Sequence, residues 1–411
     1  MTVKITHLLD NKALDVEKFI YDINMSPLND SFSNDNMAFV AAFVQKVLSD
    51  VRIENLPDLK SLCFWFRSQR LKALARSNEG KRHFRRGIGI CLHIAPSNVD
   101  TISMYSGLLS LLCGNPTIVR IPNFSSPSVR VILEAFKQLK SDARWSSVFD
   151  MFQLIYYPSD SDITERLSKI SALRVVWGGD DTVNNIRQLD ITPLASEISF
   201  ADRYSLAVFQ SSRVLDLTKN ELKSLAARFY TDAFLFGQQG CSSPRSVFWV
   251  GTHTEIKQAQ NLFWDCLKDK ALTTGNSWEP SEKMSRYVNT LEFIATGLGY
   301  VDSSVDSYKD PFVVIDLIDP LLEIHRDMHG GFGLFTQLNI ETLDQAFNLM
   351  SQKDQTLVAF GFDEAELRDS LEKCKSHCVN RIVSPGRALD FDEIWDGQDL
   401  LGRFTNHCLI F

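Results

Sequence analysis

The sequence predicts an α/β protein built from two domains, and three observations support this prediction. The chain has 411 residues, which is more than one small hydrophobic core accommodates. Short apolar strands alternate with amphipathic helices from residue 87 onward, an order typical of a parallel sheet with helical crossovers. A second series of alternating elements begins near residue 206, so we expect a second α/β domain to follow the first.

The first series of strands and helices has the order expected of a nucleotide-binding α/β domain. Residues 1–80 precede it, and their apolar side chains recur at helical spacing, which predicts helices that include 37–51 and 59–75. Gly114 follows a Leu-rich helical segment and is expected to end that helix. The expected strands are 87–94, 116–121, 152–157 and 173–177, and the expected helices are 101–113, 128–139 and 163–170.

The second series has the same alternation and contains a Gly-rich turn at residues 330–331. Its expected strands are 206–209, 246–250, 311–315, 333–337 and 356–362, and its expected helices are 219–236, 255–267, 342–351 and 364–377. The residues from Arg381 onward look irregular, and we expect them to pack on the first domain. The predicted organisation is a helical segment over 1–85, a first domain over 86–208, a second domain over 209–380 and a C-terminal segment over 381–411.

Composition and charge exclude several classes of protein. The formal net charge is −8, so the chain is a poor candidate for binding nucleic acid. Its one dense basic run, residues 81–86 (KRHFRR), fits a solvated loop, with a contact to an anionic ligand such as CoA as the alternative. No stretch approaches the ~20 apolar residues of a membrane-spanning helix. The first residues lack the apolar run of a secretory signal, so we expect a cytoplasmic protein.

The eight cysteines are scattered along the chain, and most are expected to be buried thiols in a reducing compartment. Cys374, His377 and Cys378 lie close together in the sequence, but a second pair of ligands is not evident. We therefore expect no metal site.

Cys241 is the cysteine whose sequence context points to chemistry. It lies in the segment 236–245 (FGQQGCSSPR), after a helix and a glycine and before a turn. Glycine allows a ligand to approach the backbone closely, and exposed N–H groups in such a loop lower a thiol pKa and bind a developing oxyanion. On these grounds alone, a small buried side chain is an equally good interpretation of Cys241.

Several segments in the same chain order resemble the aldehyde-dehydrogenase superfamily. The Gly-Gln-x-Gly-Cys pattern resembles its nucleophile segment, residues 96–98 (PSN) resemble its Pro-x-Asn loop, and residues 108–120 (LLSLLCGNPTIVR) resemble its helix, Gly-Asn and strand segment. The resemblance implies an aldehyde-dehydrogenase-like fold, with a Rossmann-type cofactor domain over 86–208 and an α/β catalytic domain over 209–380.

Within that superfamily the sequence is most similar to the LuxC acyl-CoA reductase family. The matching segments are 175–182 (VVWGGDDT), 202–205 (DRYS), 238–245 (QQGCSSPR) and 394–397 (IWDG). The similarity runs from about residue 87 to the C-terminus. It implies that Cys241 is the catalytic nucleophile and that Asn98 donates to the oxyanion. Glu197 stands where the superfamily has a glutamate, and the expected role is that of a base for Cys241 or for water, with a salt-bridged carboxylate as the alternative.

The resemblance also implies a nicotinamide cofactor. Arg120 replaces a lysine that touches the adenosine ribose, and Asn123 stands where many NAD-preferring members have a glutamate. A cation beside a neutral residue favours a 2′-phosphate, so we expect NADPH, with NADH as the alternative. Gly178 and Gly179 are expected to contact the pyrophosphate or the nicotinamide, or else to form a tight strand-to-helix turn. Asp327 is the nearest equivalent of a second glutamate near the nicotinamide ribose.

The function that this resemblance implies is the NADPH-dependent reduction of a fatty acyl-CoA, or an acyl-protein thioester, to a fatty aldehyde through an acyl-cysteine. The alternatives are an aldehyde dehydrogenase that oxidises aldehydes to acids and a non-catalytic acyl-binding subunit of a multienzyme complex. The family resemblance further implies an acyl-activating ligase as a partner, with a thioesterase as a further one, and a homo-oligomer.

Overall fold

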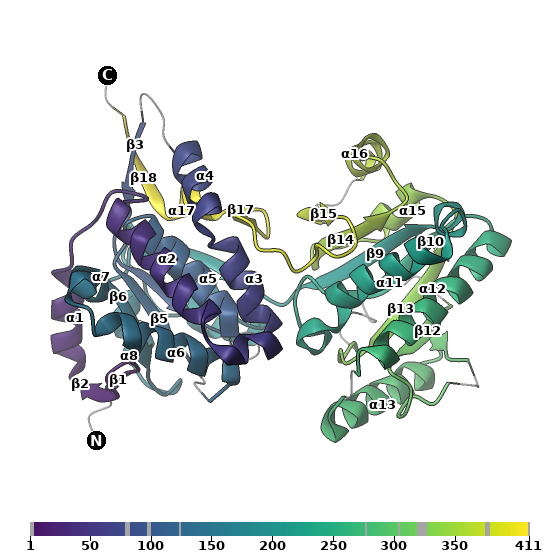
Figure 1. Ribbon diagram of the computed structural model, residues 1–411, viewed down its shortest axis with the longest axis horizontal. Helices are drawn as coiled ribbons and strands as arrows, with labels where there is room; N and C mark the ends of the chain where they lie inside the picture. The colour runs from purple at the N-terminus through teal and green to yellow at the C-terminus, as the bar shows by residue number, and fades with distance from the viewer. Residues whose placement is uncertain are drawn as a thin grey trace. The chain divides into compact units, whose positions relative to one another are not determined.

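The computed structural model describes residues 4–78, 83–96, 100–122, 125–275, 278–302, 305–318, 326, 328–374 and 379–409. The chain divides into two compact units, Met1–Asp202 with Phe391–Phe411, and Arg203–Asp390. The sequence-based boundaries at residues 85, 208 and 380 differ from this division, and the cofactor and catalytic tasks given to the two middle segments stay predictions. The predicted α/β class, with strands and helices in alternation, is confirmed in both units (Figure 1).

The first unit contains a seven-stranded sheet in the order β2-β1-β6-β5-β4-β7-β8. The five strands β6, β5, β4, β7 and β8 are parallel to one another, whereas β1 pairs antiparallel with both β2 and β6. The chain runs from β4 outward through β5 and β6, and then returns to β7 on the other side of β4. The strands of this sheet are β1 (Ile5–His7), β2 (Lys12–Leu14), β4 (Cys91–Ile94), β5 (Thr117–Arg120), β6 (Phe152–Tyr156), β7 (Leu173–Trp177) and β8 (Ser196–Phe200).

Helices pack on this sheet through apolar faces. Residues of α1, α8 and α9 share one buried cluster with β4, β5, β6 and β7. Phe39 and Phe43 of α2 stack on Phe136 of α6, which joins these two helices. The helices of the unit are α1 (Val16–Asn24), α2 (Asn34–Leu48), η1 (Val51–Asn55), α3 (Pro57–Trp65), α4 (Ser68–Asn78), α5 (Asp100–Leu112), α6 (Pro127–Lys140), η2 (Ala143–Trp145), α7 (Ser146–Met151), α8 (Ile163–Ser168) and α9 (Asp180–Arg187).

Two predictions for the first unit are wrong. The expected strand 87–94 is interrupted, because Gly89 has a φ of 131°, a conformation that glycine adopts readily; β3 (His83–Gly87) and β4 therefore belong to different sheets. Residues 1–80 are not only helical, because β1 and β2 extend the sheet at one edge. In addition, the expected helix 59–75 is divided into α3 and α4.

The second unit contains another seven-stranded sheet, in the order β11-β12-β13-β10-β9-β14-β15. All neighbouring pairs are parallel except β11 with β12. Its strands are β9 (Tyr204–Gln210), β10 (Pro244–Val250), β11 (Gly299–Tyr300), β12 (Val313–Leu317), β13 (Leu334–Ile340), β14 (Asp354–Phe360) and β15 (Arg381–Val383). Its helices are α10 (Ser211–Leu215), α11 (Lys219–Phe234), η3 (Leu235–Gln238), α12 (His253–Thr273), α13 (Pro280–Ala295), α15 (Leu343–Asn348) and α16 (Glu364–Lys373).

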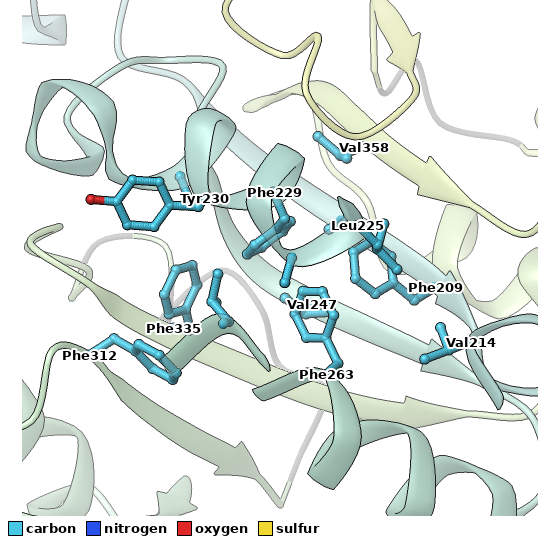
Figure 2. Close-up of a cluster of buried hydrophobic side chains, with 14 of the residues drawn as sticks. Phe209, Val214, Leu225, Phe229, Tyr230, Val247, Phe263, Phe312, Phe335 and Val358 are labelled. Carbon is cyan, nitrogen blue, oxygen red and sulfur yellow. The ribbon is translucent and has the colours of Figure 1, made fainter. Parts of the chain in front are cut away.

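The central strands of the second unit are buried on both faces. Phe209 and Trp249 pack with α11 and α12 in one cluster, while Val208 and Phe248 pack with α13 and α15 in another. Aromatic rings fill the first cluster, where Phe263 lies 5.0 Å from Phe209 between ring centroids (Figure 2). Edge-to-face contacts of this kind stabilise a core beyond the area that they bury. The two clusters fix β9 and β10, and with them the segment between α11 and β10.

The C-terminal residues are more regular than expected. After β15, the chain forms the hairpin of β16 (Ile394–Trp395) and β17 (Gln398–Asp399), the short helix α17 (Leu400–Arg403) and β18 (Thr405–Leu409). β18 pairs antiparallel with β3, which ties the C-terminal segment to the first unit. The expectation of an irregular segment is therefore wrong. These elements are too short to show a periodic pattern in the sequence.

Candidate active site

Cys241 lies in a tight loop between η3 and β10. It is partly exposed, whereas Gly240 before it and Ser242 after it are buried. The N–H of Ser243 donates to the carbonyl of Gly240 at 3.0 Å, which closes a turn around the cysteine. The residues on both sides of Cys241 are therefore buried, and Cys241, which carries the thiol, is partly exposed.

The chain enters this loop through an uncommon backbone conformation. Phe236, Gly237 and Gln238 have φ values of 58°, 62° and 61°. The left-handed conformation costs a residue with a Cβ about 1–2 kcal/mol, so Phe236 and Gln238 require support from their surroundings. Strain of this kind persists where neighbouring structure over-determines the backbone, and functional loops often have it.

Ser205, near the start of β9, forms hydrogen bonds that hold the Cys241 loop on the sheet. Its hydroxyl donates to the carbonyl of Cys241 at 2.6 Å and accepts from the N–H of Thr356 on β14 at 3.2 Å. Ser205 is fully buried, so these bonds are shielded from water. The backbone of Cys241 is thus tied to two adjacent strands of the sheet.

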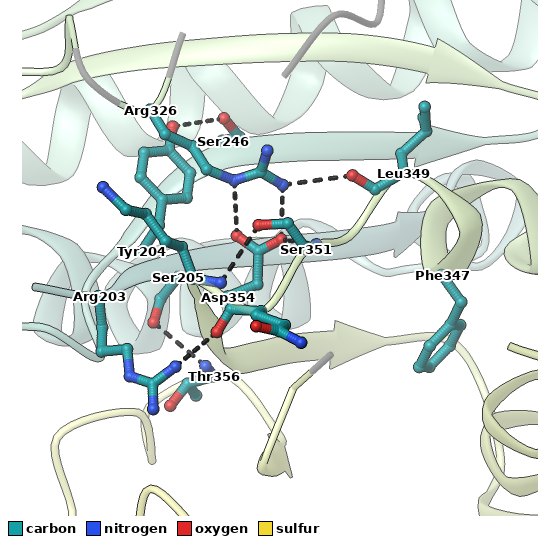
Figure 3. A network of polar contacts seen from close by, with 12 residues as sticks. Arg203, Tyr204, Ser205, Ser246, Arg326, Phe347, Leu349, Ser351, Asp354 and Thr356 are labelled. Carbon is teal, nitrogen blue, oxygen red and sulfur yellow. Dashed lines mark hydrogen bonds and ion pairs between the residues drawn. The ribbon is translucent and has the colours of Figure 1, made fainter. Parts of the chain in front are cut away.

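A polar network surrounds Ser205 at the amino ends of β9, β10 and β14 (Figure 3). Arg326 pairs with Asp354 through Nε at 2.9 Å and Nη2 at 2.5 Å, and both side chains are buried. Burial raises the pKa of Asp354, and the hydrogen bonds from Arg326 offset only part of this effect. Tyr204 Oη and Ser246 Oγ are 2.7 Å apart. The network stabilises the amino ends of these strands, where the Cys241 loop joins the sheet.

The Gly-rich turn at residues 330–333 packs against the same loop. The N–H of Phe332 donates to the carbonyl of Gly237 at 2.8 Å, and Gln239 Nε2 donates to the carbonyl of Gly330 at 2.7 Å. Gly331 has a φ of 82°, and a Cβ there would lie 3.0 Å from the carbonyl oxygen of Gly237, so the backbone conformation and the close approach favour glycine.

His329 supports the turn and is not a proton donor to the site. Burial lowers the pKa of His329 to about 3, so the ring is neutral. Its Nδ1 accepts from the N–H of Gly331 at 3.1 Å, and its Nε2 therefore carries the proton and donates to the carbonyl of Leu334. Both ring nitrogens are committed to backbone groups.

A cavity of about 710 Å³ lies in the first unit, at the carboxyl ends of its parallel strands. Ligands of open parallel sheets bind where the strand order reverses, and here the order reverses between β4 and β7. The cavity is lined by Ile94, Ala95, Pro96, Arg120, Pro122, Ser159, Asp160, Ser161, Thr164, Trp177, Gly178, Gly179, Thr182, Asn185, Ile186 and Leu189.

Three of the sequence-predicted cofactor residues meet at this cavity. Arg120 lies at the end of β5, over the ring of Tyr157 at 5.4 Å, and donates to the carbonyl of Tyr157 at 3.3 Å. Its buried Nε has no acceptor among the described residues. Gly178 and Gly179 follow β7 and precede α9, and no atom of the residues that the structure describes lies within 4 Å of a Cβ built on Gly179. All three residues line the cavity, and the space beside Gly179 is open to a bound molecule.

Glu197 lies on β8 and does not line the cavity. Its carboxylate accepts from Arg174 Nη2 at 2.6 Å, from Arg187 Nε at 3.3 Å and from Ser199 Oγ at 2.7 Å. Burial acts to raise the pKa of Glu197, but the hydrogen bonds from Ser199 and Arg174 outweigh it and hold the pKa below its usual range. The carboxylate is ionised and committed to these partners.

The remaining predicted site residues, Asn98, Asn123 and Asp327, lie outside the described residues. So do His377 and Cys378, next to Cys374. Within the described ranges, no three His, Cys, Asp or Glu side chains are grouped as a metal site. No helix in the same ranges has the length and apolar composition needed to cross a membrane.

Residues 50–285 match the family of acyl-CoA reductases known as LuxC. The matched residues make up more than half of the chain. The chain belongs to the LuxC acyl-CoA reductase family. Family membership makes it an oxidoreductase that acts on acyl or aldehyde groups, and the resemblance inferred from the sequence is confirmed. A comparison with curated proteins gives no significant match.

Solved structures show the fold of this LuxC family member. A salicylaldehyde dehydrogenase from Pseudomonas putida G7, in complex with salicylaldehyde, has a TM-score of 0.67 at 13% identity, over 100% of this chain and 94% of its own. An NAD-dependent benzaldehyde dehydrogenase from Corynebacterium glutamicum has a TM-score of 0.65 at 12% identity, over 99% and 93%. An indole-3-acetaldehyde dehydrogenase with bound NAD⁺ has a TM-score of 0.65 at 10% identity, over 98% and 92%. The aldehyde-dehydrogenase-like fold is therefore confirmed.

Two residues that support the Cys241 loop of this LuxC family member were not assigned a role from the sequence. Ser205 and Gln238 both lie in family-like segments, 202–205 and 238–245. Their contacts are with backbone groups that the fold brings near them, and a linear pattern gives no sign of such contacts. The only signal in the sequence was their occurrence within the segments that carry the resemblance.

Proposed function

We propose that this protein reduces a fatty acyl-CoA, or an acyl-protein thioester, to the fatty aldehyde, with NADPH as reductant and Cys241 as the acyl carrier. One observation carries the proposal: in a member of an acyl-CoA reductase family, a partly exposed cysteine stands on a loop that its neighbours hold in a strained conformation. A cysteine with only a packing role needs neither the exposure nor the strain.

In the first step, the Cys241 thiolate attacks the carbonyl carbon of the acyl thioester. The carbon–sulfur bond to Cys241 forms, the bond to CoA breaks, and CoA leaves as a thiolate that takes up a proton. The N–H of Cys241 and Asn98 are the proposed donors to the oxyanion, and a good donor contributes roughly 3–4 kcal/mol in such sites. Asn98 enters the proposal on the sequence resemblance alone. The product is a thioester on Cys241.

A bound nicotinamide cofactor supplies the hydride that reduces this thioester. Cys241 then leaves as a thiolate from the reduced carbon, the carbonyl of the aldehyde forms, and the nucleophile is restored. Covalent capture splits one exchange into two easier steps, and it keeps the acyl carbon as a thioester, which accepts hydride more readily than a carboxylate does.

The cavity of the first unit fits a dinucleotide. Its position at the switch point and the Nε of Arg120, which has no acceptor among the described residues, suit a phosphate-bearing ligand. Asp180 and Asp181 lie in the first turn of α9 and oppose an anion there, so Arg120 is the main proposed phosphate contact. Arg120, with Asn123, favours the 2′-phosphate of NADPH, and NADH remains the alternative. Asp327 is proposed to face the nicotinamide ribose.

Glu197 has a secondary place in the proposal. To act as a base for Cys241 or for water, its carboxylate would first have to leave Arg174 and Arg187. If a Glu197→Gln variant that folds acylates Cys241 and forms aldehyde at the wild-type rate, this task for Glu197 is refuted.

The acyl donor is proposed to come from an acyl-activating ligase, because a reductase of thioesters needs a supply of activated acyl groups. A homo-oligomer is also proposed, on the family resemblance.

The acyl carrier is tested with tetradecanoyl-CoA in the absence of NADPH. Intact-protein and peptide mass spectrometry should show one tetradecanoyl group on the peptide that contains Cys241, and Cys241→Ala should abolish this adduct. In a separate assay with NADPH present, Cys241→Ala should also abolish the oxidation of NADPH. Cys266→Ala is the matched control, because Cys266 is also a partly exposed thiol in the second unit. This control should be acylated and should turn over as the wild type does.

Three results would overturn the proposal. A stable adduct on another peptide would remove Cys241 as carrier. Turnover of free tetradecanal with NADP⁺, without turnover of tetradecanoyl-CoA with NADPH, would establish an aldehyde-oxidising dehydrogenase instead. Acylation without any nicotinamide oxidation would favour a non-catalytic acyl-binding subunit.

A further inference from the structure

The side chain of Gln238 makes two hydrogen bonds that enclose the Cys241 loop. Its Nε2 donates to the carbonyl of Pro244 at 3.0 Å, and its Oε1 accepts from the N–H of Gly333 at 2.9 Å. Gln238 and Pro244 each stand three residues from Cys241, on opposite sides. The first bond therefore closes a ring of backbone with the nucleophile at its centre, and the second joins this ring to the Gly-rich turn.

Gln238 is suited to this task by its burial and its chemistry. The side chain is fully buried, and its primary amide provides a donor and an acceptor at the same end. Both are needed, because Pro244 offers a carbonyl oxygen and Gly333 offers an N–H. A carboxylate of the same shape would accept from Gly333 but would place negative charge against the oxygen of Pro244.

The backbone of Gln238 gives a second, independent sign that its position is constrained. Its φ of 61° is the last of the three successive left-handed values that turn the chain toward Cys241. The contacts between the Gly-rich turn and Gly237 and Gln239 hold the residues on each side of it. The Gln238 amide spans the loop itself, from the strained residue to the residue that begins β10.

From these contacts we infer that Gln238 is a positioning residue, whose amide holds the 238–244 loop in the shape that presents the Cys241 thiol to the acyl carbonyl. The inference rests on the proposed function, in which Cys241 carries the acyl group. Gln238 itself touches no reacting atom. Loss of its bond to Pro244 should slow the attack by Cys241 while the affinity for the acyl thioester and for the nucleotide stays unchanged.

Gln238→Glu tests this inference through pH. At low pH the introduced carboxyl is protonated and still donates to the carbonyl of Pro244, whereas at high pH the carboxylate is repelled by that carbonyl. We expect the rate of Cys241 acylation by tetradecanoyl-CoA, divided by the wild-type rate at each pH, to fall at least tenfold between about pH 6 and pH 8.5. Gln260→Glu is the matched control, since Gln260 is also buried in the second unit and bonds Asn339 at 2.8 Å. Its ratio should stay constant.

A second reagent separates this inference from the proposed function. Alkylation of Cys241 by iodoacetamide requires a presented thiol but no acyl substrate, so the ratio for Gln238→Glu should fall with pH there too. If tetradecanoyl-CoA fails to acylate the wild type, the proposed function is wrong, and the alkylation ratio still decides the inference. A ratio near one at every pH in both reactions overturns it.

Gln238→Met covers the case in which the charged variant does not fold. Methionine fills the same volume without either hydrogen bond. We expect kcat to fall at least tenfold with KM for tetradecanoyl-CoA and NADPH within twofold of the wild type. An unchanged kcat, or a loss that lies entirely in KM, would contradict a positioning role.

Discussion

Asp232 is a buried carboxyl on α11, the helix that leads into the Cys241 loop. It accepts from the N–H of Gly386 at 2.6 Å and from the N–H of Ala388 at 2.9 Å, and so holds the segment after β15 against the helix. Burial raises the pKa of Asp232 to about 7, in spite of these two bonds. The folded protein therefore retains a proton on Asp232 at pH values where the unfolded chain has lost it.

This raised pKa makes stability depend on pH in a defined direction. The contribution of Asp232 is fully present below its unfolded pKa of 3.8 and is lost as the pH rises through about 7. Asp232→Asn cannot titrate, so between about pH 5 and pH 7.5 the wild type should lose roughly 2 kcal/mol of unfolding free energy relative to this variant. Urea unfolding at the two pH values, followed by tryptophan fluorescence, measures the difference.

Asp344→Asn is the control for this experiment. Asp344 is partly exposed to solvent, and the hydrogen bond from Ser370 lowers its pKa, so it is ionised in both states across the whole pH range. Its effect should be the same at both pH values. A difference between the wild type and Asp232→Asn that does not change with pH would show that Asp232 is ionised in the folded protein.

At the scale of elements, Gly114 after α5 joins this helix to the segment between α1 and α2. Gly114 has a φ of 91°, and its carbonyl accepts from the N–H of Asn29 at 3.0 Å. A Cβ at this position would lie 2.1 Å from the carbonyl oxygen of Asn29. The glycine is therefore required twice, for its backbone conformation and for the approach of the segment between α1 and α2.

Gly114→Ala should be more damaging than a glycine substitution that only strains the backbone. Gly275 also has a positive φ, 71°, but no atom of the described residues lies within 4 Å of its Cβ position. Gly275→Ala should lower the free energy of unfolding by about 1 kcal/mol, because only the backbone conformation is strained. Gly114→Ala should cost roughly 1–3 kcal/mol more, because Asn29 must move. Thermal unfolding of both variants compares them, and equal losses would show that the Asn29 contact is not restrictive.

The strands that were predicted well are those whose burial is reflected directly in an apolar sequence. β7, β9 and β10 are buried along almost their whole length and appear in the sequence as continuous apolar runs. α13 was not predicted because several of its polar side chains are buried while several of its apolar side chains are exposed. Its buried positions include Arg286 and Thr290, whereas Met284 and Leu291 are exposed. Fully buried Arg286 donates to several loop carbonyls, among them Pro311 at 2.8 Å, a role that hydrophobic periodicity does not reveal.

The candidate site was predictable to the extent that its residues lie in one segment of sequence. Cys241 was identified from the residues around it and from the order of the other family-like segments. The supports of its loop were not, because Ser205 and Gly333 are distant in the chain and meet the loop only in the fold. The ion pairs of Glu197 with Arg174 and Arg187 likewise depend on β7, β8 and α9 being neighbours.

For the whole molecule, the two units carry different parts of the proposed reaction. The cavity with Arg120 belongs to the first unit, and Cys241 belongs to the second. Acylation needs only the thiol and the acyl thioester, whereas reduction needs the nucleotide as well. The two half-reactions should therefore respond separately to changes in the two units.

Arg120→Ala tests this separation together with the cofactor preference. Loss of a charge-assisted contact of about 1.5–3 kcal/mol should raise the Kd of NADPH at least tenfold, while the Kd of NADH changes less, because NADH lacks the 2′-phosphate. Acylation of Cys241 without nucleotide should stay at the wild-type rate. Nucleotide fluorescence titration and mass spectrometry measure the two quantities, with Arg130→Ala, an exposed arginine on α6, as control. Equal losses for NADPH and NADH would contradict the 2′-phosphate contact. A matching loss of acylation would show that Arg120 serves both half-reactions, and the tasks of the units would then not be separable.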